Sequence, residues 1–210
     1  MAEALIPLFP LSLVLLPNAA LPLHIFEDRY REMMGDIVPG HREFGVVLAK
    51  DRGIVNIGCT ATVEQVVRRY PDGRLDIVAV GRRRFSVLSL NDEKTYLRAS
   101  VEFFNDEQAT DVPPELRAQA IQEYQKLRVV IDDPDRPEPR LDQPQMSFEL
   151  AEWIEDTEKR QIVLAMRSEV QRLEYLVSIL PQYTTQQEHI RLAKRVAPLN
   201  GHAKHVLKHS

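Results

Sequence analysis

The spacing of the apolar residues changes near residue 106, and this change constrains the fold more than any other feature of the sequence. Before it, apolar residues lie in short runs bounded by proline or by turn residues, which is typical of β-strands. After it, Leu116, Ala120, Tyr124, Leu127 and Ile131 recur at helical spacing over about four turns. We therefore expect an α+β protein whose first half is a β-structure and whose second half is a helical bundle.

Turn residues in the first half indicate antiparallel hairpins. The sequence Pro-Asp-Gly at 71–73 separates two apolar runs and is a standard hairpin signal, and the polar residues 91–94 separate two more. One helix is expected at residues 27–38, whose first turn carries the acidic Glu27 and Asp28. Several short strands at this spacing predict a closed or partly closed barrel. The strands are expected at residues 5–9, 21–25, 44–49, 57–67, 75–80, 85–90 and 96–104.

A long run without charged side chains extends from Ala4 to Phe26. A run of this length is compatible with a membrane span or a signal sequence. However, four prolines interrupt it, and each proline in a helix interior costs about 3 kcal/mol. Glu3 also stands where a signal sequence carries positive charge. We therefore expect buried strands joined by proline turns, in a cytoplasmic protein that has no membrane partner.

Prolines also divide the second half. Residues 132–144 hold four of them and are expected to form a loop, and Pro181 is expected to end a helix. The expected helices of this half, beyond the first, cover residues 148–154, 158–166, 169–180 and 185–196. The expected domains are a β-barrel subdomain with one inserted helix at residues 1–107, a helical subdomain at residues 108–198 and a flexible basic tail at residues 199–210.

No sequence motif for catalysis or cofactor binding is present. The eight glycines form neither a phosphate-binding G-x-x-x-x-G-K-[ST] loop nor a dinucleotide fingerprint, and no serine lies in a G-x-S-x-G elbow. Four of the six histidines lie at or beyond His189, which leaves His24 and His41 as bases for a hydrolase built from dispersed residues. The single Cys59 can form neither an internal disulfide nor a zinc site alone. We expect a buried thiol, no enzyme activity, no cofactor and no metal ion.

Two groups of arginines, at residues 68–69 and 82–84, raise the alternative of nucleic-acid binding. Within a strand Arg83 faces away from Arg82 and Arg84, so the three do not form one patch. Few aromatic residues lie between the arginines, although single-strand binding needs them for stacking. The net charge of −4 is also mild. We expect no nucleic-acid partner and keep an RNA-binding PUA-like module as the alternative function.

Several segments, taken in order, resemble the N-terminal domain of Lon proteases. The resemblance covers roughly residues 5 to 180. One departure is Cys59, where the family more often has threonine directly after the glycine. Another is the absence of the Walker motifs and the Ser-Lys pair of a full Lon protease. The similar segments are residues 6–11 (IPLFPL), 14–17 (VLLP), 21–30 (LPLHIFEDRY), 44–48, 72–74, 84–85, 159–164 and 172–176.

The resemblance implies a PUA-like β pseudo-barrel followed by a C-terminal helical bundle. It also implies a non-catalytic module that binds unfolded or degron-bearing polypeptide segments, or a protease partner. An apolar groove at the junction of barrel and helices is one place for such a segment, and Phe104, Met146 and Trp153 are its candidate lining residues. The alternative is that these three side chains simply pack the two subdomains together.

Overall fold

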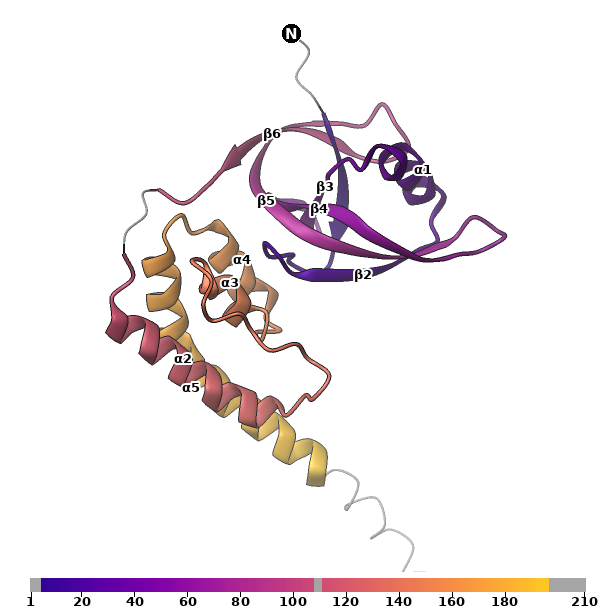
Figure 1. Cartoon of the computed structure of the whole chain (residues 1–210). Coiled ribbons are helices and arrows are strands. Elements are labelled where there is room, and N and C mark those ends of the chain that lie inside the picture. The colour runs from indigo at the N-terminus through magenta and orange to yellow at the C-terminus, as the bar shows by residue number, and fades with distance from the viewer. Residues whose placement is uncertain (1–4, 108–110, 197–210) are drawn as a thin grey trace, which may run out of the picture. The chain divides into compact units, whose positions relative to one another are not determined.

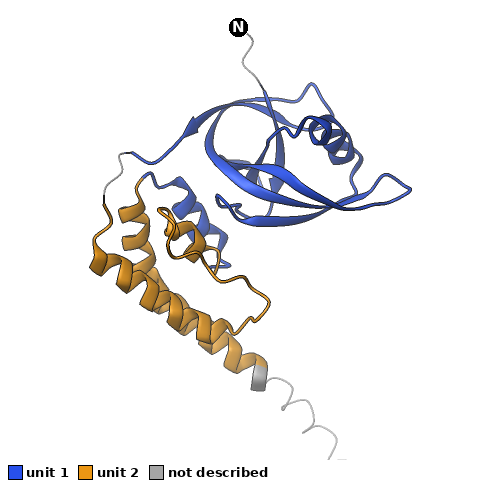
Figure 2. Ribbon diagram, in the orientation of Figure 1, with its two compact units in different colours: residues 1–108, 154–167 blue, residues 109–153, 168–210 orange. Residues whose placement is uncertain are grey.

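The computed structural model of the chain describes residues 5–107 and 111–196, which form two compact units (Figures 1 and 2). The first, which we call the barrel unit, holds residues 5–107 together with 154–167. The second, the helical unit, holds residues 111–153 together with 168–196. A sheet and separate helices among these residues confirm the expected α+β class. The tail expected at residues 199–210 lies outside the described residues.

The strands of the barrel unit form one sheet that closes on itself (Figure 1). They are β1 (Ile6–Leu11), β2 (Ala20–Ile25), β3 (Phe44–Lys50), β4 (Gly53–Arg69), β5 (Leu75–Asn91) and β6 (Arg98–Phe104). These six strands of the described residues lie in the order β2-β5-β4-β3-β1-β6, and β5 also pairs with β6. Strands β1 and β3 to β6 therefore form a ring, and β2 extends the sheet from β5 as an edge strand.

Neighbouring strands are antiparallel, as the turn residues predict, except that β1 and β3 pair in parallel. The β5 strand is continuous, although the sequence predicts a break after Val80. Gly81 lies where the connection between β1 and β2 crosses β5, and a Cβ atom there would be 2.1 Å from the carbonyl oxygen of Leu16. The two segments fit past each other because the residue at the crossing has no side chain.

The charge-free N-terminal run supplies part of the barrel's interior. Leu8 of β1 packs in a fully buried cluster with Val47 and Phe85. Phe9 packs against Tyr30 of helix α1 (Asp28–Ile37), with their ring centroids 4.1 Å apart. The run therefore anchors the core, as its apolar composition predicts. Within the part of the chain that the structure describes, no helix has both the length and the apolar character needed to cross a membrane.

Helix α4 (Thr157–Ala165) belongs to the barrel unit, although segments of the helical unit precede and follow it in sequence. Arg84 of β5, which is only 4% exposed, attaches α4 to the sheet. The Arg84 guanidinium donates hydrogen bonds to the carbonyl oxygens of Leu164, at 3.2 Å, and of Met166, and it forms an ion pair with Asp106. One buried arginine thus joins the sheet, the end of α4 and the segment that follows β6.

The helical unit is built on two long helices that pack together, α2 (Pro114–Ile131) and α5 (Glu169–Val196). The predicted division of α5 into two helices at Pro181 is wrong, because the helix continues through this residue. A proline in a helix interior removes a backbone donor and costs about 3 kcal/mol. Leu180 and Tyr183 are buried beside it, and burial of such side chains contributes about 1.5–3 kcal/mol each. Packing therefore offsets the proline.

A buried network of polar groups joins the short helix α3 (Met146–Ala151) to the start of α5. The Glu169 carboxylate accepts hydrogen bonds from the backbone N–H and the hydroxyl of Ser147, at 2.9 and 2.6 Å. Arg172, which is 0% exposed, donates to the same hydroxyl and to Glu169, both at 2.7 Å. Its guanidinium also lies 4.4 Å from the ring centroid of Phe148. The two buried charges are therefore paired with each other and bonded to neighbours.

Candidate functional site

The three residues expected to line a groove are buried. Phe104 belongs to the barrel unit and is 8% exposed, whereas Met146 and Trp153 belong to the helical unit and are 0% and 2% exposed. Trp153 packs edge-on against Tyr124, with centroids 5.4 Å apart. Side chains buried to this degree present little surface to a ligand. The groove role of Phe104, Met146 and Trp153 stays a prediction, and surface residues are better candidates for direct contact.

A cross-strand row of polar side chains lies on the solvent-exposed side of the barrel unit. His24 of β2 is opposite Asp76 of β5, which in turn is opposite Arg68 of β4. The His24 Nδ1 atom is 2.6 Å from one Asp76 oxygen, and the Tyr70 hydroxyl donates to the other at 2.7 Å. The hydrogen bonds from His24 and Tyr70 hold the pKa of the Asp76 carboxyl below its usual value. The hydrogen bond from the Tyr70 hydroxyl to Asp76 also raises the pKa of Tyr70.

Phe26 extends this row with an exposed aromatic ring. It is 60% exposed, more than any other large apolar side chain described in the barrel unit. Its ring stacks on His24, with centroids 5.9 Å apart and planes at 22°, and His24 also meets the edge of Tyr70. We call His24, Phe26, Tyr70 and Asp76 the aromatic face. Hydrogen bonds to Asp76 hold His24 and Tyr70 in place, and Phe26 stacks on His24. The exposed side of the Phe26 ring can therefore pack against an apolar side chain of another molecule.

Arginines surround Tyr70 without forming a broad cationic surface. The guanidinium groups of Arg68 and Arg74 lie 4.6 and 4.8 Å from its ring centroid. Arg74 is paired with Asp72 at 2.8 Å. In the second arginine group, Arg82 pairs with Glu64, Arg83 pairs with Glu43 and Arg84 is buried. Each group is thus close to local acids, which weakens its attraction for a polyanion.

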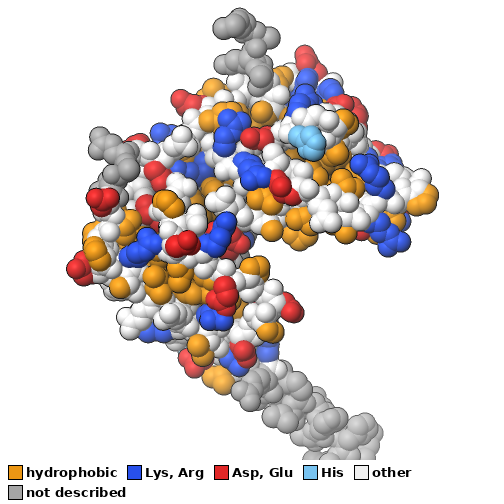
Figure 3. All heavy atoms as spheres, in the orientation of Figure 1, with side chains coloured by type: hydrophobic (Ala, Val, Ile, Leu, Met, Phe, Trp, Pro, Cys, Tyr) orange, Lys and Arg blue, Asp and Glu red, His pale blue; other side chains and the backbone are white. Residues whose placement is uncertain are grey.

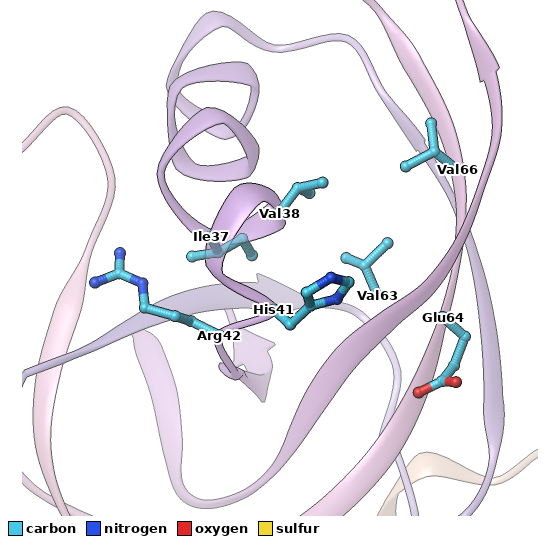
Figure 4. Close-up of a pocket in the computed structure, with 7 residues that line it drawn as sticks. All are labelled: Ile37, Val38, His41, Arg42, Val63, Glu64 and Val66. Atoms are coloured by element: carbon cyan, nitrogen blue, oxygen red, sulfur yellow. The ribbon is translucent and has the colours of Figure 1, made fainter.

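A small cavity lies between α1 and β4 (Figure 4). It has a volume of about 100 Å³, and we call it the α1–β4 slot. In Figure 4 the His41 ring points toward Val63 across the slot, whereas Arg42 extends from the other side of the turn. None of the lining residues is a serine, threonine or cysteine, so the slot offers no hydroxyl or thiol nucleophile to His41. The slot is lined by Ile37, Val38, His41, Arg42, Val63, Glu64 and Val66.

The remaining candidates for chemistry are the Cys59 thiol and clusters of metal-binding side chains. Cys59 is 0% exposed, and burial raises the pKa of its thiol to about 12. The thiolate that would react is therefore scarce at neutral pH. No cluster of three or more His, Cys, Asp or Glu side chains suited to a metal ion occurs within residues 5–107 and 111–196. On the face shown in Figure 3, hydrophobic side chains lie among charged ones over both units.

The sequence singled out His24 but not the residues that surround it in the structure. Asp76 and His24 are 52 positions apart, and only the pairing of β2 with β5 brings them together. The local sequence carries one usable signal, which is a phenylalanine placed between a strand and the acidic start of a helix. In the structure this ring is 60% exposed.

Comparisons with known proteins agree with this architecture. Residues 5–182 match the sequence profile of the ATP-dependent protease La (LON) substrate-binding domain. A Lon protease from Anaeromyxobacter dehalogenans is 30% identical over 137 residues, which are 61% of this chain and 16% of that protein. A Lon protease from Flavobacterium johnsoniae is 27% identical over 123 residues, 54% of this chain and 15% of that protein. The chain therefore spans only a small part of these relatives.

Two solved structures share the fold. The crystal structure of a Lon N-terminal domain protein from Xanthomonas campestris superimposes with a TM-score of 0.68 at 27% identity, covering 83% of this chain and 98% of that one. The N-terminal domain of a Lon protease from the Mycobacterium avium complex gives a TM-score of 0.61 at 19% identity, covering 85% and 98%. The second likeness concerns the fold alone.

Proposed function

The chain belongs to the family of the ATP-dependent protease La (LON) substrate-binding domain, and from that premise we propose that it binds unfolded or degron-bearing polypeptide through the aromatic face. The observation that carries the proposal is the exposed Phe26 ring, which is 60% accessible and stacked on His24. An apolar side chain of a bound segment covers this ring and removes it from water. Burying an exposed aromatic side chain contributes about 1.5–3 kcal/mol.

Strand β2 favours recognition through side chains rather than through addition of a strand. It is the edge strand of the sheet, and Pro22 lies in its middle, opposite Val78. Proline has no N–H to donate, so an added strand would lose one bond of its ladder. Pro22 is exposed and offers an apolar surface on the same strand as His24. A segment lying across Pro22 and Phe26 gains apolar contact without needing a defined backbone register, which suits varied polypeptides.

The remaining parts of the proposal follow from the same premise. We propose that the module is non-catalytic, because the matched family is a substrate-binding domain and the slot near His41 lacks a hydroxyl or thiol nucleophile. We also propose a cytoplasmic location and either polypeptide substrates or a protease as partner. The predicted role of Phe104, Met146 and Trp153 in binding a segment is kept as a separate, second proposal.

A binding experiment tests the proposal. A fluorescently labelled, reduced and carboxymethylated protein serves as a permanently unfolded probe, and anisotropy gives its affinity for the full chain. Phe26→Ser is expected to weaken binding about tenfold, because the lost apolar contact is worth at least about 1.4 kcal/mol. Leu88→Ser is the matched control, since Leu88 is 58% exposed on β5.

The outcomes test separately whether the chain binds unfolded polypeptide and whether the aromatic face is the binding site. Binding by the wild type that responds to Phe26→Ser, but not to Leu88→Ser, supports both. Equal losses in the two variants contradict the aromatic face as the site. Failure of the wild-type chain to bind any unfolded probe contradicts the function itself.

A further inference from the structure

The imidazole of His24 is held in one orientation by the strand beside it. Its register partner on β5 is Asp76, and the His24 Nδ1 atom lies 2.6 Å from one Asp76 oxygen. The other Asp76 oxygen accepts the Tyr70 hydroxyl at 2.7 Å. Both oxygens of the carboxylate are therefore engaged. The Nδ1 edge of the imidazole faces Asp76, and the Nε2 atom, across the ring from Nδ1, points away from it.

The contact with Asp76 also fixes which imidazole nitrogen carries the proton. The hydrogen bonds from His24 and Tyr70 hold the pKa of the Asp76 carboxyl below its usual value, so this group is ionised at neutral pH. An ionised carboxylate can only accept hydrogen bonds. The proton between the two groups therefore lies on Nδ1, and Nε2 of the neutral imidazole is left as an acceptor.

The Nε2 acceptor is open to a ligand. Among residues 5–107 and 111–196, the His24 side chain forms hydrogen bonds only to Asp76, through Nδ1. The side chain is 44% exposed, and it belongs to β2, the edge strand of the sheet. Phe26 stacks on the imidazole with the two planes at 22°. Stacking covers a face of the ring, whereas the Nε2 lone pair lies in the plane of the ring and stays uncovered by Phe26.

A backbone N–H is the donor that best fits an acceptor at a polypeptide-binding face. Every residue except proline carries one, whatever its side chain. In folded proteins more than about 90% of the buried N–H groups are already paired, whereas an unfolded segment has them available. An acceptor for N–H groups therefore favours unfolded over folded polypeptide without reading the sequence.

We propose that His24 Nε2 accepts a hydrogen bond from a backbone N–H of the bound polypeptide, next to the side chain that covers Phe26. The ring centroids of His24 and Phe26 are 5.9 Å apart, and consecutive Cα atoms of a peptide are about 3.8 Å apart. One segment thus reaches both, with an apolar side chain on Phe26 and the N–H of the same or the next residue at Nε2. Asp76 is a positioning residue, because it fixes the tautomer. This inference rests on the proposed polypeptide-binding function and adds the contact that selects unfolded segments.

Methylation of single amides in a small peptide tests this hydrogen bond. The probe is a labelled glycine peptide with one central phenylalanine, and anisotropy gives its affinity for the full chain. N-methylation of the phenylalanine and of the residue after it removes both candidate N–H groups without changing the charge. This change is expected to weaken binding about threefold to tenfold, the range for one hydrogen bond. N-methylation of two glycines at the end of the peptide is the matched control, and little effect is expected.

The variant His24→Phe separates the hydrogen bond from other effects of methylation. It keeps an aromatic ring for Phe26 to stack on and removes the acceptor. We expect it to weaken binding of the unmethylated peptide about as much as methylation does. Methylation should then cause no further loss, because the bond is already absent. A methylation penalty of equal size in the wild type and in His24→Phe would overturn the inference.

The variant Asp76→Asn tests the role of the tautomer. With the asparagine oxygen occupied by the Tyr70 hydroxyl, the amide nitrogen donates to Nδ1, and the imidazole proton moves to Nε2. NMR of the imidazole nitrogens of His24 is expected to show the proton on Nδ1 in the wild type and on Nε2 in this variant, with binding weakened as in His24→Phe. Asp72→Asn is the matched control, since Asp72 pairs with Arg74, and it is expected to keep both tautomer and affinity.

Two further results would contradict the inference, namely a wild-type His24 protonated on Nε2 and an Asp76→Asn variant of full affinity. The role of His24 is also removed, without loss of the proposed function, if unfolded protein responds to Phe26→Ser but not to His24→Phe. If neither the unfolded protein nor the peptide binds the wild-type chain, the proposed function fails as well.

Discussion

The barrel unit exposes an aromatic side chain to solvent, whereas the helical unit buries its aromatic and charged side chains of most interest. The barrel unit exposes Phe26 and supports it with a hydrogen-bonded row. The helical unit instead buries its single tryptophan, Trp153, and a charged pair, Arg172 and Glu169. The difference indicates that Trp153, Arg172 and Glu169 hold the helical unit together, whereas Phe26 of the barrel unit remains available to a ligand.

The largest expected effect concerns the stability that the buried Arg172–Glu169 pair gives to the helical unit. Arg172→Met leaves the Glu169 carboxylate buried without its cation, and loss of one partner of a buried pair costs about 3–5 kcal/mol. The free energy of unfolding from urea denaturation is the measurement. The double variant Arg172→Met with Glu169→Leu is expected to recover much of the loss, since both charges are then gone. A single variant as stable as the wild type would show that the network does not stabilise the helical unit.

A smaller effect is expected at the other buried arginine. Arg84→Met removes the donor for the carbonyls of Leu164 and Met166. The bond to Leu164 is the buried one, and a buried acceptor left without its donor costs about 1–3 kcal/mol. Amide hydrogen exchange is expected to accelerate in α4 and to stay unchanged in α2. Equal acceleration in both helices would contradict the assignment of α4 to the barrel unit.

The smallest effect concerns pH. The pKa of Asp76 is lowered by its bonds to His24 and Tyr70, so its contribution to stability is present above the unfolded-state pKa of about 3.9. It is lost as the pH falls through the lower folded-state pKa, because the carboxyl then takes up a proton. The support of Phe26 should loosen in this range, which NMR signals of the Phe26 ring can follow. Asp76→Asn is expected to abolish that pH dependence. If the Phe26 signals still change with pH in this variant as in the wild type, Asp76 does not support the Phe26 ring.

Local signals in the sequence predicted much of the fold. The Pro-Asp-Gly turn at residues 71–73 specifies the β4–β5 hairpin, and the acidic start of α1 lies within one residue of its predicted position. Pro181 misled the prediction because a local rule ignores tertiary packing around Leu180 and Tyr183. The return of α4 to the barrel unit has no sequence signature either, since it depends on a bond from a residue about 80 positions away.

The candidate site was harder to predict than the fold. Phe104, Met146 and Trp153 were chosen for their residue type, and their type is equally suited to a core, which is where they lie. The aromatic face depends on the register between β2 and β5, which aligns His24 with Asp76. Residue type alone cannot give that register, because a shift by one position turns each side chain to the other face of the sheet.

The central claim is that polypeptide binds the aromatic face of the barrel unit. Amide hydrogen exchange with and without saturating unfolded protein, on the wild-type chain, tests it most directly. The account predicts slower exchange at residues 20–30 and 68–76, with no change in α3. Slower exchange confined to residues 146–153, with none near Phe26, would contradict it and would favour the groove at Met146 and Trp153 instead.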